Sequence, residues 1–167
     1  GWDVYLIKTD NNGDEQWYRT FGGLSSDDGY AVQQTTDGGY IIVGDTYSYG
    51  ASWGVYLIKT DSNGNQQWYR TFGGSRDDRG YGVRQTTDGG YIIVGSTDSY
   101  GAGNKDVYLI KTDSNGNEQW YRTFGGSSFD LGLAVQQIAD DGYIIVGFTY
   151  SYSASNDDVY LIKTNSN

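Results

Sequence analysis

The chain repeats one sequence pattern four times along its 167 residues. The string D-V-Y-L-I-K-T begins at Asp3, Asp106 and Asp158, and it occurs once with Gly54 as its first residue, so successive copies are 51, 52 and 52 residues apart. The strings Q-W-Y-R-T-F-G-G and G-Y-I-I-V-G keep the same phase. A period of this length is typical of repeat architectures, in which one unit cannot bury its apolar faces without its neighbours.

The composition excludes several kinds of site. The sequence has no Cys, His, Met or Pro, which rules out disulfides, thiolate or imidazole metal sites and His-dependent catalytic triads. The net charge of -10 opposes binding to phosphate backbones and anionic membranes, so no nucleic-acid partner is expected. No apolar stretch approaches the ~20 residues of a membrane span, so no membrane insertion is expected. The start at Gly1 and the end at Asn167, inside a turn, predict a processed or excised piece of a longer protein.

Each repeat predicts four short strands separated by turn residues. In one repeat, residues 81–86 alternate apolar and polar, 91–95 are an apolar and β-branched run, and 107–112 and 119–124 are rich in Val, Ile, Tyr, Trp and Phe. We name these strands a, b, c and d. An Asn-Gly pair joins c to d and predicts a type I′ hairpin turn, with positive φ at both central residues. The three pairs are Asn12-Gly13, Asn63-Gly64 and Asn115-Gly116.

The hairpins predict a set of cross-strand pairs. Centring each hairpin on its Asn-Gly pair places a lysine of strand c opposite a tryptophan of strand d, where the lysine stem can lie on the indole ring. We interpret these pairs as structural because they recur in every copy. They are Lys8–Trp17, Lys59–Trp68 and Lys111–Trp120.

The b and c strands are apolar at consecutive positions, so both faces of each sheet should be covered. Small four-stranded sheets that stack face to face around an axis satisfy this requirement, and the predicted fold is therefore an all-β protein of β-propeller blades. Ala31, Gly82 and Ala134 suit an innermost a strand, where blades crowd most. A solenoid of parallel coils is the alternative, but its coils are usually shorter and need no Asn-Gly hairpin.

The combined pattern T-F-G-G-x-x-x-D-x-G-Y-x-V, D-G-G-Y-I-I-V-G-x-T and D-V-Y-L-I-K-T-D-x-N-G-N-x-x-W resembles the β-propeller repeats of bacterial and archaeal surface and secreted proteins. The resemblance covers essentially the whole chain. It implies a propeller with this strand order and an extracellular or cell-surface location. It carries over no catalytic residue. Propellers of that family usually have more blades than this chain can make.

Counting strands predicts an open structure with incomplete ends. The segments are a half blade of strands c and d (3–29), blades at 30–72 and 81–124, and a partial blade of strands a, b and c (133–167). About three blades plus one extra strand cannot close a ring, since propellers close with ~4–8 blades. Two copies of the chain could form a six-bladed ring, and an imperfect rotation would give a filament. The expected self-association edges are Val4, Tyr5, Leu6, Ile7, Val159, Tyr160, Leu161 and Ile162.

The loops between strands d and a and between b and c differ from copy to copy, whereas the other turns scarcely change. Both variable loop types belong on one face of the disc, which is where a ligand such as a glycan or a surface protein would bind. The alternative is that the loops vary between copies without any binding role, because loops tolerate sequence change. The candidate ligand-binding residues on this face are Tyr47, Tyr49, Trp53, Asp98, Tyr100, Tyr150, Tyr152, Arg76, Arg79 and Lys105.

No catalytic residue, metal site or cofactor is predicted. The acidic segment 10–14 has its Gly at the wrong place for an EF-hand loop. In each of the adjacent pairs Asp27-Asp28 and Asp157-Asp158, the two side chains are expected to point to opposite faces of a strand, so they cannot act as a catalytic pair. We interpret Asp27, Asp78 and Asp130, which recur in each copy, as turn-fixing residues. Two functional hypotheses remain: a non-enzymatic scaffold that self-associates into a ring or filament, and a multivalent lectin-like or adhesin-like binding module.

Overall fold

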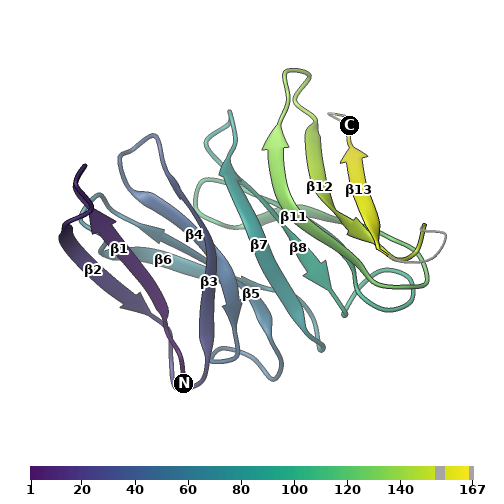
Figure 1. The fold of residues 1–167 in the computed structure, drawn as a ribbon, viewed down its shortest axis with the longest axis horizontal. Helices are drawn as coiled ribbons and strands as arrows, with labels where there is room; N and C mark the ends of the chain where they lie inside the picture. The colour runs from purple at the N-terminus through teal and green to yellow at the C-terminus, as the bar shows by residue number, and fades with distance from the viewer. Residues whose placement is uncertain (153–156, 166–167) are drawn as a thin grey trace.

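The computed structural model describes residues 1–152 and 157–165 of the chain. The described residues form an all-β structure of thirteen strands in four antiparallel sheets, without a helix (Figure 1). The expected partial blade 133–167 therefore lies in part outside the described residues. The strands are β1 (Val4–Thr9), β2 (Glu15–Phe21), β3 (Asp27–Gln34), β4 (Tyr40–Thr46), β5 (Gly54–Thr60), β6 (Gln66–Phe72), β7 (Asp78–Gln85), β8 (Tyr91–Thr97), β9 (Asp106–Thr112), β10 (Glu118–Phe124), β11 (Asp130–Gln137), β12 (Tyr143–Thr149) and β13 (Asp158–Lys163).

The sheets follow the predicted order of strands. They are β1-β2, β3-β4-β5-β6, β7-β8-β9-β10 and β11-β12-β13, which correspond to strands c-d, a-b-c-d, a-b-c-d and a-b-c. They stand side by side along the molecule, with the half blade at one end and the three-stranded sheet at the other (Figure 1). This open arrangement fits β-propeller blades, and the predicted all-β fold class is confirmed.

The core lies between successive sheets. One cluster of buried apolar side chains joins β1-β2 to the second sheet, another joins the second to the third, and another joins the third to β11-β12-β13. Within strand c, alternate residues serve different junctions. Val55 and Leu57 face the sheet that follows, whereas Tyr56 and Ile58 face the sheet that precedes. Consecutive apolar residues are therefore required wherever a strand lies between two neighbours.

The type I′ prediction for the Asn-Gly hairpins is wrong. Gly13 has φ +89° and its N–H donates to Asp10 O (3.2 Å), while Asp10 N donates to Asp14 O (2.9 Å). Asp141 is the one non-glycine with positive φ among the described residues, so Asn12 is not left-handed. The turn is a type I turn followed by a left-handed glycine, a common arrangement for hairpins of this length. The Asp10 carboxylate stabilises it by accepting from Asn12 N (2.8 Å) and Asp14 N (3.0 Å).

The predicted lysine–tryptophan register is confirmed, and the structure also shows where the charged groups beside the indole lie. Lys59 pairs with Trp68 across β5 and β6, yet its ammonium group donates to Asp37 Oδ2 in the a–b turn (2.8 Å). The Arg70 guanidinium, 5.4 Å from the ring centre, lies over that indole instead. The first hairpin lacks a–b strands in its own sheet, and there the Lys8 ammonium lies 6.0 Å from its indole.

The a strands begin at Asp27, Asp78 and Asp130, three residues before the expected 30, 81 and 133. These aspartates are fully buried. In the third sheet, Asp78 Oδ1 accepts from the Thr97 hydroxyl, and Oδ2 accepts from Ser99 Oγ (2.7 Å) and Gly74 N (2.8 Å). The aspartate thus fixes the d–a turn, as interpreted, and also joins it to the end of strand b.

Candidate functional site: the incomplete terminal sheets

The junctions inside the molecule show what each sheet face requires. In strand a of the third sheet, a Cβ on Gly80 would lie 2.6 Å from Val43 Cγ2 and 2.9 Å from Val55 Cγ1. Strand a therefore packs on strands b and c of the preceding sheet without space for a side chain. Val83, farther along the same strand, is 0% exposed in this junction.

The first junction lacks its strand b. Gly29 occupies the position of Gly80, and the three atoms nearest to a Cβ there would all belong to the Val4 side chain of strand c, the first at 2.8 Å. Val32, the counterpart of Val83, is 51% exposed. A shallow cavity of about 160 Å³ lies here, lined by β1, β3 and Ile42. The face of β3 at this end is therefore partly uncovered, because the first sheet has strands c and d but no strand b.

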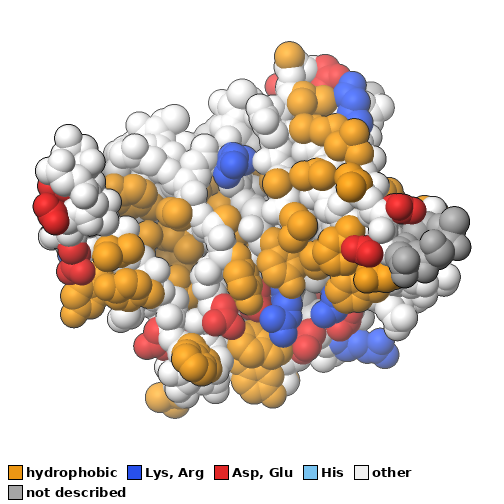
Figure 2. Space-filling view, viewed as in Figure 1, with side chains coloured by type: hydrophobic (Ala, Val, Ile, Leu, Met, Phe, Trp, Pro, Cys, Tyr) orange, Lys and Arg blue, Asp and Glu red, His pale blue; other side chains and the backbone are white. Residues whose placement is uncertain are grey.

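The opposite end presents the complementary strands. Val146 in β12 is the counterpart of Val43, which is fully buried, yet Val146 is 41% exposed. Two side chains of β13 on the same face, Val159 and Leu161, are also exposed. Figure 2 shows hydrophobic side chains over β11–β13 and, at the far end, over β1 and β2.

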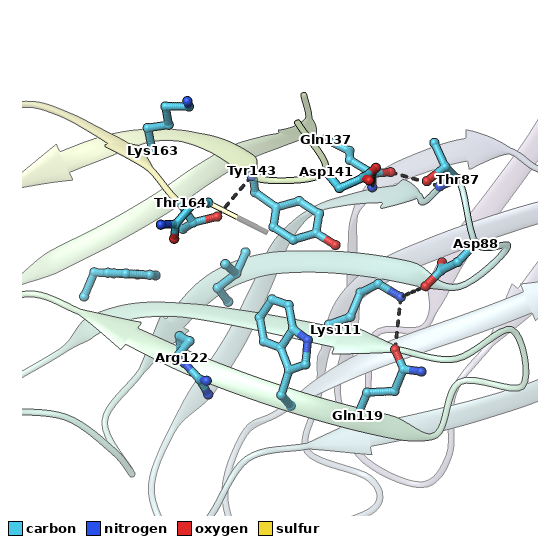
Figure 3. A pocket seen from close by; sticks show the side chains of 14 residues that line it. Thr87, Asp88, Lys111, Gln119, Arg122, Gln137, Asp141, Tyr143, Lys163 and Thr164 are labelled. Carbon is cyan, nitrogen blue, oxygen red and sulfur yellow. Dashed lines mark hydrogen bonds and ion pairs between the residues drawn. The ribbon is translucent and has the colours of Figure 1, made fainter. Parts of the chain in front are cut away.

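A larger cavity of about 660 Å³ lies between the third sheet and β11-β12-β13 (Figure 3). Trp120, Arg122 and Lys111 line it from β9 and β10. At its edge, Lys111 Nζ donates to Asp88 Oδ2 (2.8 Å) and to Gln119 Oε1 (3.1 Å). Although burial opposes ionisation, the hydrogen bonds from Lys111 and from a neighbouring threonine lower the pKa of Asp88 to about 2.

Three tyrosines predicted to bind a ligand tie the variable loops together. The hydroxyls of Tyr49, Tyr100 and Tyr152 donate to the carbonyls of Gly22, Gly73 and Gly125 in the preceding d–a loops, at 2.8–3.0 Å. The rings of Tyr49 and Tyr100 stack on tyrosines of strand d. These bonds bring the two variable loop types to one face, and they also use the phenol groups of these tyrosines in the fold.

Other predicted ligand residues form a cluster at the second junction. The rings of Tyr47 and Trp53 are 5.6 Å apart, and the Arg79 guanidinium lies 5.0 Å from the Trp53 ring. An open cavity of about 360 Å³ is lined by Tyr47 and Trp53 together with Ser25 and Ser26. A smaller cavity of about 140 Å³ beside it is lined by Tyr49 and by Trp53, so the predicted aromatic residues of this junction border two open spaces.

The remaining predicted ligand residues lie elsewhere. At the third junction Lys105 is 3.5 Å from Asp98, and its ammonium lies 5.7 Å from the Phe129 ring. The Tyr150 ring packs edge-on against Phe129 (6.2 Å). Arg76 contributes its carbonyl oxygen, which accepts from a serine of the neighbouring loop (2.9 Å). The ten predicted residues are therefore distributed over successive junctions and do not converge on one site.

An ion pair in the second junction was not predicted. Asp45 is fully buried and its Oδ2 accepts from Arg79 Nη1 (3.1 Å) and, more weakly, from Tyr30 (3.4 Å). Its Oδ1 and the buried Ser96 Oγ, which occupies the same position in the next copy, have no hydrogen-bond partner among the described residues. Burial outweighs Arg79 and raises the pKa of Asp45 to about 7. The sequence feature that could have pointed to this ion pair is that the position varies between copies, as Asp45, Ser96 and Phe148.

Within the described ranges 1–152 and 157–165, no group of three or more carboxylate side chains is placed to hold a metal ion. The same part of the chain contains no helix that is long and apolar enough to cross a membrane.

No protein-family model matches this sequence, and no curated protein matches it.

Proposed function

We propose that the chain is a non-enzymatic scaffold of β-propeller blades that associates head to tail through its incomplete terminal sheets. The observation that carries this proposal is the relation between the two ends. The N-terminal end exposes Gly29 and Val32 where strand b is missing, and the C-terminal end exposes Val146, the residue that packs at this position in the internal junctions.

The internal junctions support this pairing because they are built from the same sequence. Val43 packs on Gly80, and Val94 occupies the equivalent place on Gly132. The exposed b strand and the exposed a strand therefore have the shapes that already fit each other twice in this chain. Exposed apolar sheet faces and unpaired edges favour association. Because the two surfaces are different, the contact is heterologous and gives either a closed ring or a filament.

The proposed setting is extracellular or on a cell surface. It rests on the resemblance of the repeats to the β-propeller repeats of surface and secreted proteins. In that setting the nearly constant turns would face one way and the variable loops the other, so an assembly would present a row of variable loops.

The test is the mass of the particle in solution, measured by size-exclusion chromatography with light scattering over a dilution series. The wild-type chain, 18.4 kDa, should form dimers or larger species that dissociate on dilution. Val146→Asp should remain folded and monomeric, because Val146 is partly exposed in the free chain but buried in the assembly. Leu24→Asp, at a loop residue that is 99% exposed, should associate like wild type. A wild-type monomer at every concentration contradicts the proposal.

The cavity beside Tyr47 and Trp53 favours a second candidate function, binding of a carbohydrate or a surface protein by the variable loops. Aromatic rings beside hydroxyl groups can stack on a sugar ring and bond its hydroxyls. A glycan array would test it: binding should be lost with Trp53→Ala and kept with Leu133→Ala, at an exposed apolar residue outside this cavity.

A further inference from the structure

Strand c is buried on both faces in the complete sheets. In β5, Val55 and Leu57 on one face and Tyr56 and Ile58 on the other are all between 0% and 1% exposed. The same four side chains of β9 have the same exposure. The apolar sequence V-Y-L-I therefore suits a strand that has a neighbouring sheet on each side.

β1 and β13 carry the same sequence, but each buries only half of it. In β1, Val4 and Leu6 are buried against the second sheet, whereas Tyr5 and Ile7 are 55% and 46% exposed. In β13 the opposite face is covered: Ile162 is 9% exposed and packs with the third sheet.

The uncovered face of β13 completes the comparison. Val159 and Leu161 are 80% and 65% exposed, and they occupy the positions at which Val4 and Leu6 of β1 are buried. β1 thus buries the face that packs on the following sheet, and β13 buries the face that packs on the preceding sheet, whereas β5 and β9 bury both. A single strand that has the third sheet of one copy on one side and the second sheet of another copy on the other would bury both faces.

We propose that the head-to-tail contact forms by strand exchange: β1 of a second copy of this chain replaces β13 beside β12. This inference rests on the proposed self-association and specifies its partner and its regulation. The composite blade consists of β11 and β12 of one copy with β1 and β2 of the other. β13 acts as an internal cap, because it occupies the position that the incoming strand requires.

The attachment of the two strands decides which one leaves. β1 is paired with β2 along its length, and Trp2 O in front of it accepts from Asp27 N (2.7 Å), as Trp53 O accepts from Asp78 N (2.8 Å) at the second junction. β13 pairs with β12 alone. Removing β13 breaks its pairing with β12 and the packing of Ile162 on the third sheet, and the incoming β1 replaces both of these contacts. Removing β1 from its own chain would break its pairing with β2 and the packing of Val4 and Leu6 on the second sheet, and nothing in the exchange would replace them.

The large cavity fits the hairpin that would arrive with β1. At the internal junctions the c–d turn of each sheet packs on the preceding d strand: a Cβ on Gly64 would lie 2.7 Å from the Trp17 ring, and one on Gly116 would lie equally close to Trp68. Gly13, the equivalent residue of the first hairpin, has nothing within 4 Å.

Trp120 and Arg122 are the counterparts of Trp68 and Arg70, and both line the 660 Å³ cavity (Figure 3). In the exchanged assembly the turn at Gly13 lies on this pair. The turn carries Asp10 and Asp14, whose charges complement the Arg122 guanidinium.

Two further groups find partners in the same exchange. Lys163 Nζ donates to Asp140 Oδ2 (2.8 Å), as Lys111 does to Asp88, whereas Lys8 has no ion-pair partner among the described residues. When β1 replaces β13, Lys8 takes the place of Lys163 at Asp140.

The aromatic rings beside the loops show the same relation. Trp2 is 76% exposed and precedes β1, as Trp53 precedes β5. Tyr150 is 46% exposed and follows β12, as Tyr47 follows β4. Since the rings of Tyr47 and Trp53 pack together (5.6 Å), Tyr150 of one copy and Trp2 of the next form the equivalent pair in the composite blade.

A pair of matched substitutions at equivalent positions tests the direction of the exchange. Ile162→Asp weakens the cap and should lower the concentration for half-assembly about tenfold, whereas Ile7→Asp weakens the incoming strand and should abolish assembly at the same concentrations. The opposite signs, with Ile162→Asp weakening assembly and Ile7→Asp leaving it unchanged, would show that β13 stays and overturn the exchange. A wild-type chain that never associates overturns the proposed function itself.

Cysteine cross-linking provides a second measurement. Ile144 pairs with Lys163 across β12 and β13. After exchange, Ile144 of one copy faces Lys8 of the other. Mixing Ile144→Cys with Lys8→Cys chains under oxidation, or with a short thiol cross-linker, should give a covalent dimer on a cysteine-free background. The contrary result uses a chain that carries both Ile144→Cys and Lys163→Cys. If these two residues cross-link within one chain at every concentration at which the protein is assembled, β13 has stayed beside β12 and the exchange does not occur.

Discussion

Asp45 accepts a hydrogen bond from Arg79 across the junction between the second and third sheets, at 3.1 Å. The carboxylate is fully buried, whereas the Arg79 side chain is 27% exposed. The Asp45 side chain therefore loses more solvation than the single ion pair restores, and its pKa rises to about 7, with a further contribution from nearby Asp28. Stability at this junction should depend on pH.

The first prediction concerns that pH dependence. The folded-state pKa of Asp45 lies above its unfolded value of 3.8, so the folded chain holds the extra proton between about pH 4 and pH 7. The free energy of unfolding should fall as pH rises through this window, by on the order of 3 kcal/mol. Asp45→Asn should remove that part of the slope in urea unfolding curves, and Asp98→Asn, in a partly exposed loop, should not. An unchanged slope in Asp45→Asn would falsify this assignment.

The second prediction concerns the a–b turns and has the opposite sign. Hydrogen bonds from Lys59 and a threonine lower the pKa of Asp37 to about 2. This contribution to stability is present above pH 4 and is lost as pH falls from about 4 through 2. Asp37→Asn should make unfolding less sensitive to acid in that window. Asp14→Asn, which the other hairpins already carry, is the control, and an equal effect of both variants argues against Lys59 as the cause.

The third prediction uses two glycines at equivalent positions. Gly80→Ala places a Cβ 2.6 Å from Val43 Cγ2 and 3.1 Å from Gly44 O, and it should destabilise the fold by about 1–3 kcal/mol. Gly29→Ala places its Cβ nearest to the Val4 side chain, beside an open cavity, so its cost in the free chain should be smaller. Thermal unfolding of dilute samples measures both. Equal losses would mean that the first junction is already filled.

The fourth prediction concerns the buried aspartates. In Asp78→Asn, an amide NH₂ group replaces an oxygen that accepts from Ser99, Gly74 or Thr97, so at least one donor faces another donor in a buried site. We expect a loss of about 3 kcal/mol in urea unfolding. Asp61→Asn, in an exposed hairpin turn, should cost much less, and a comparable loss there would point to turn geometry as the shared cause.

Local sequence accounts for the strands and for much of the pairing between them. Alternation, apolar runs and glycine-containing turns correctly predicted all thirteen strands and the register of Lys59 with Trp68. These features are encoded locally because adjacent antiparallel strands are joined by short turns that fix their register. The type of the hairpin turn was missed, since the Asp10 carboxylate, four residues before Asp14, selects a different backbone.

The candidate residues illustrate what could not be read from the chain. The Tyr100 hydroxyl donates to Gly73 O, and the Lys59 ammonium donates to Asp37. Both acceptors lie more than 20 residues away in the sequence, and only the folded sheet brings them close. The string Q-W-Y-R-T-F around Trp120 does not reveal the cavity beside it, since the same string surrounds Trp68, on whose ring the turn at Gly116 packs.

The sequence by itself determined the repeat, the order of the strands and the faces that strand c must bury. Only the tertiary structure decided which copy buries them. Tyr5 and Tyr56 stand in the same string, V-Y-L-I-K-T, yet the first is 55% exposed and the second 1%. The reason is physical: burial depends on the sheets that stand on either side of a strand, and identical residues differ when one of those neighbours is missing.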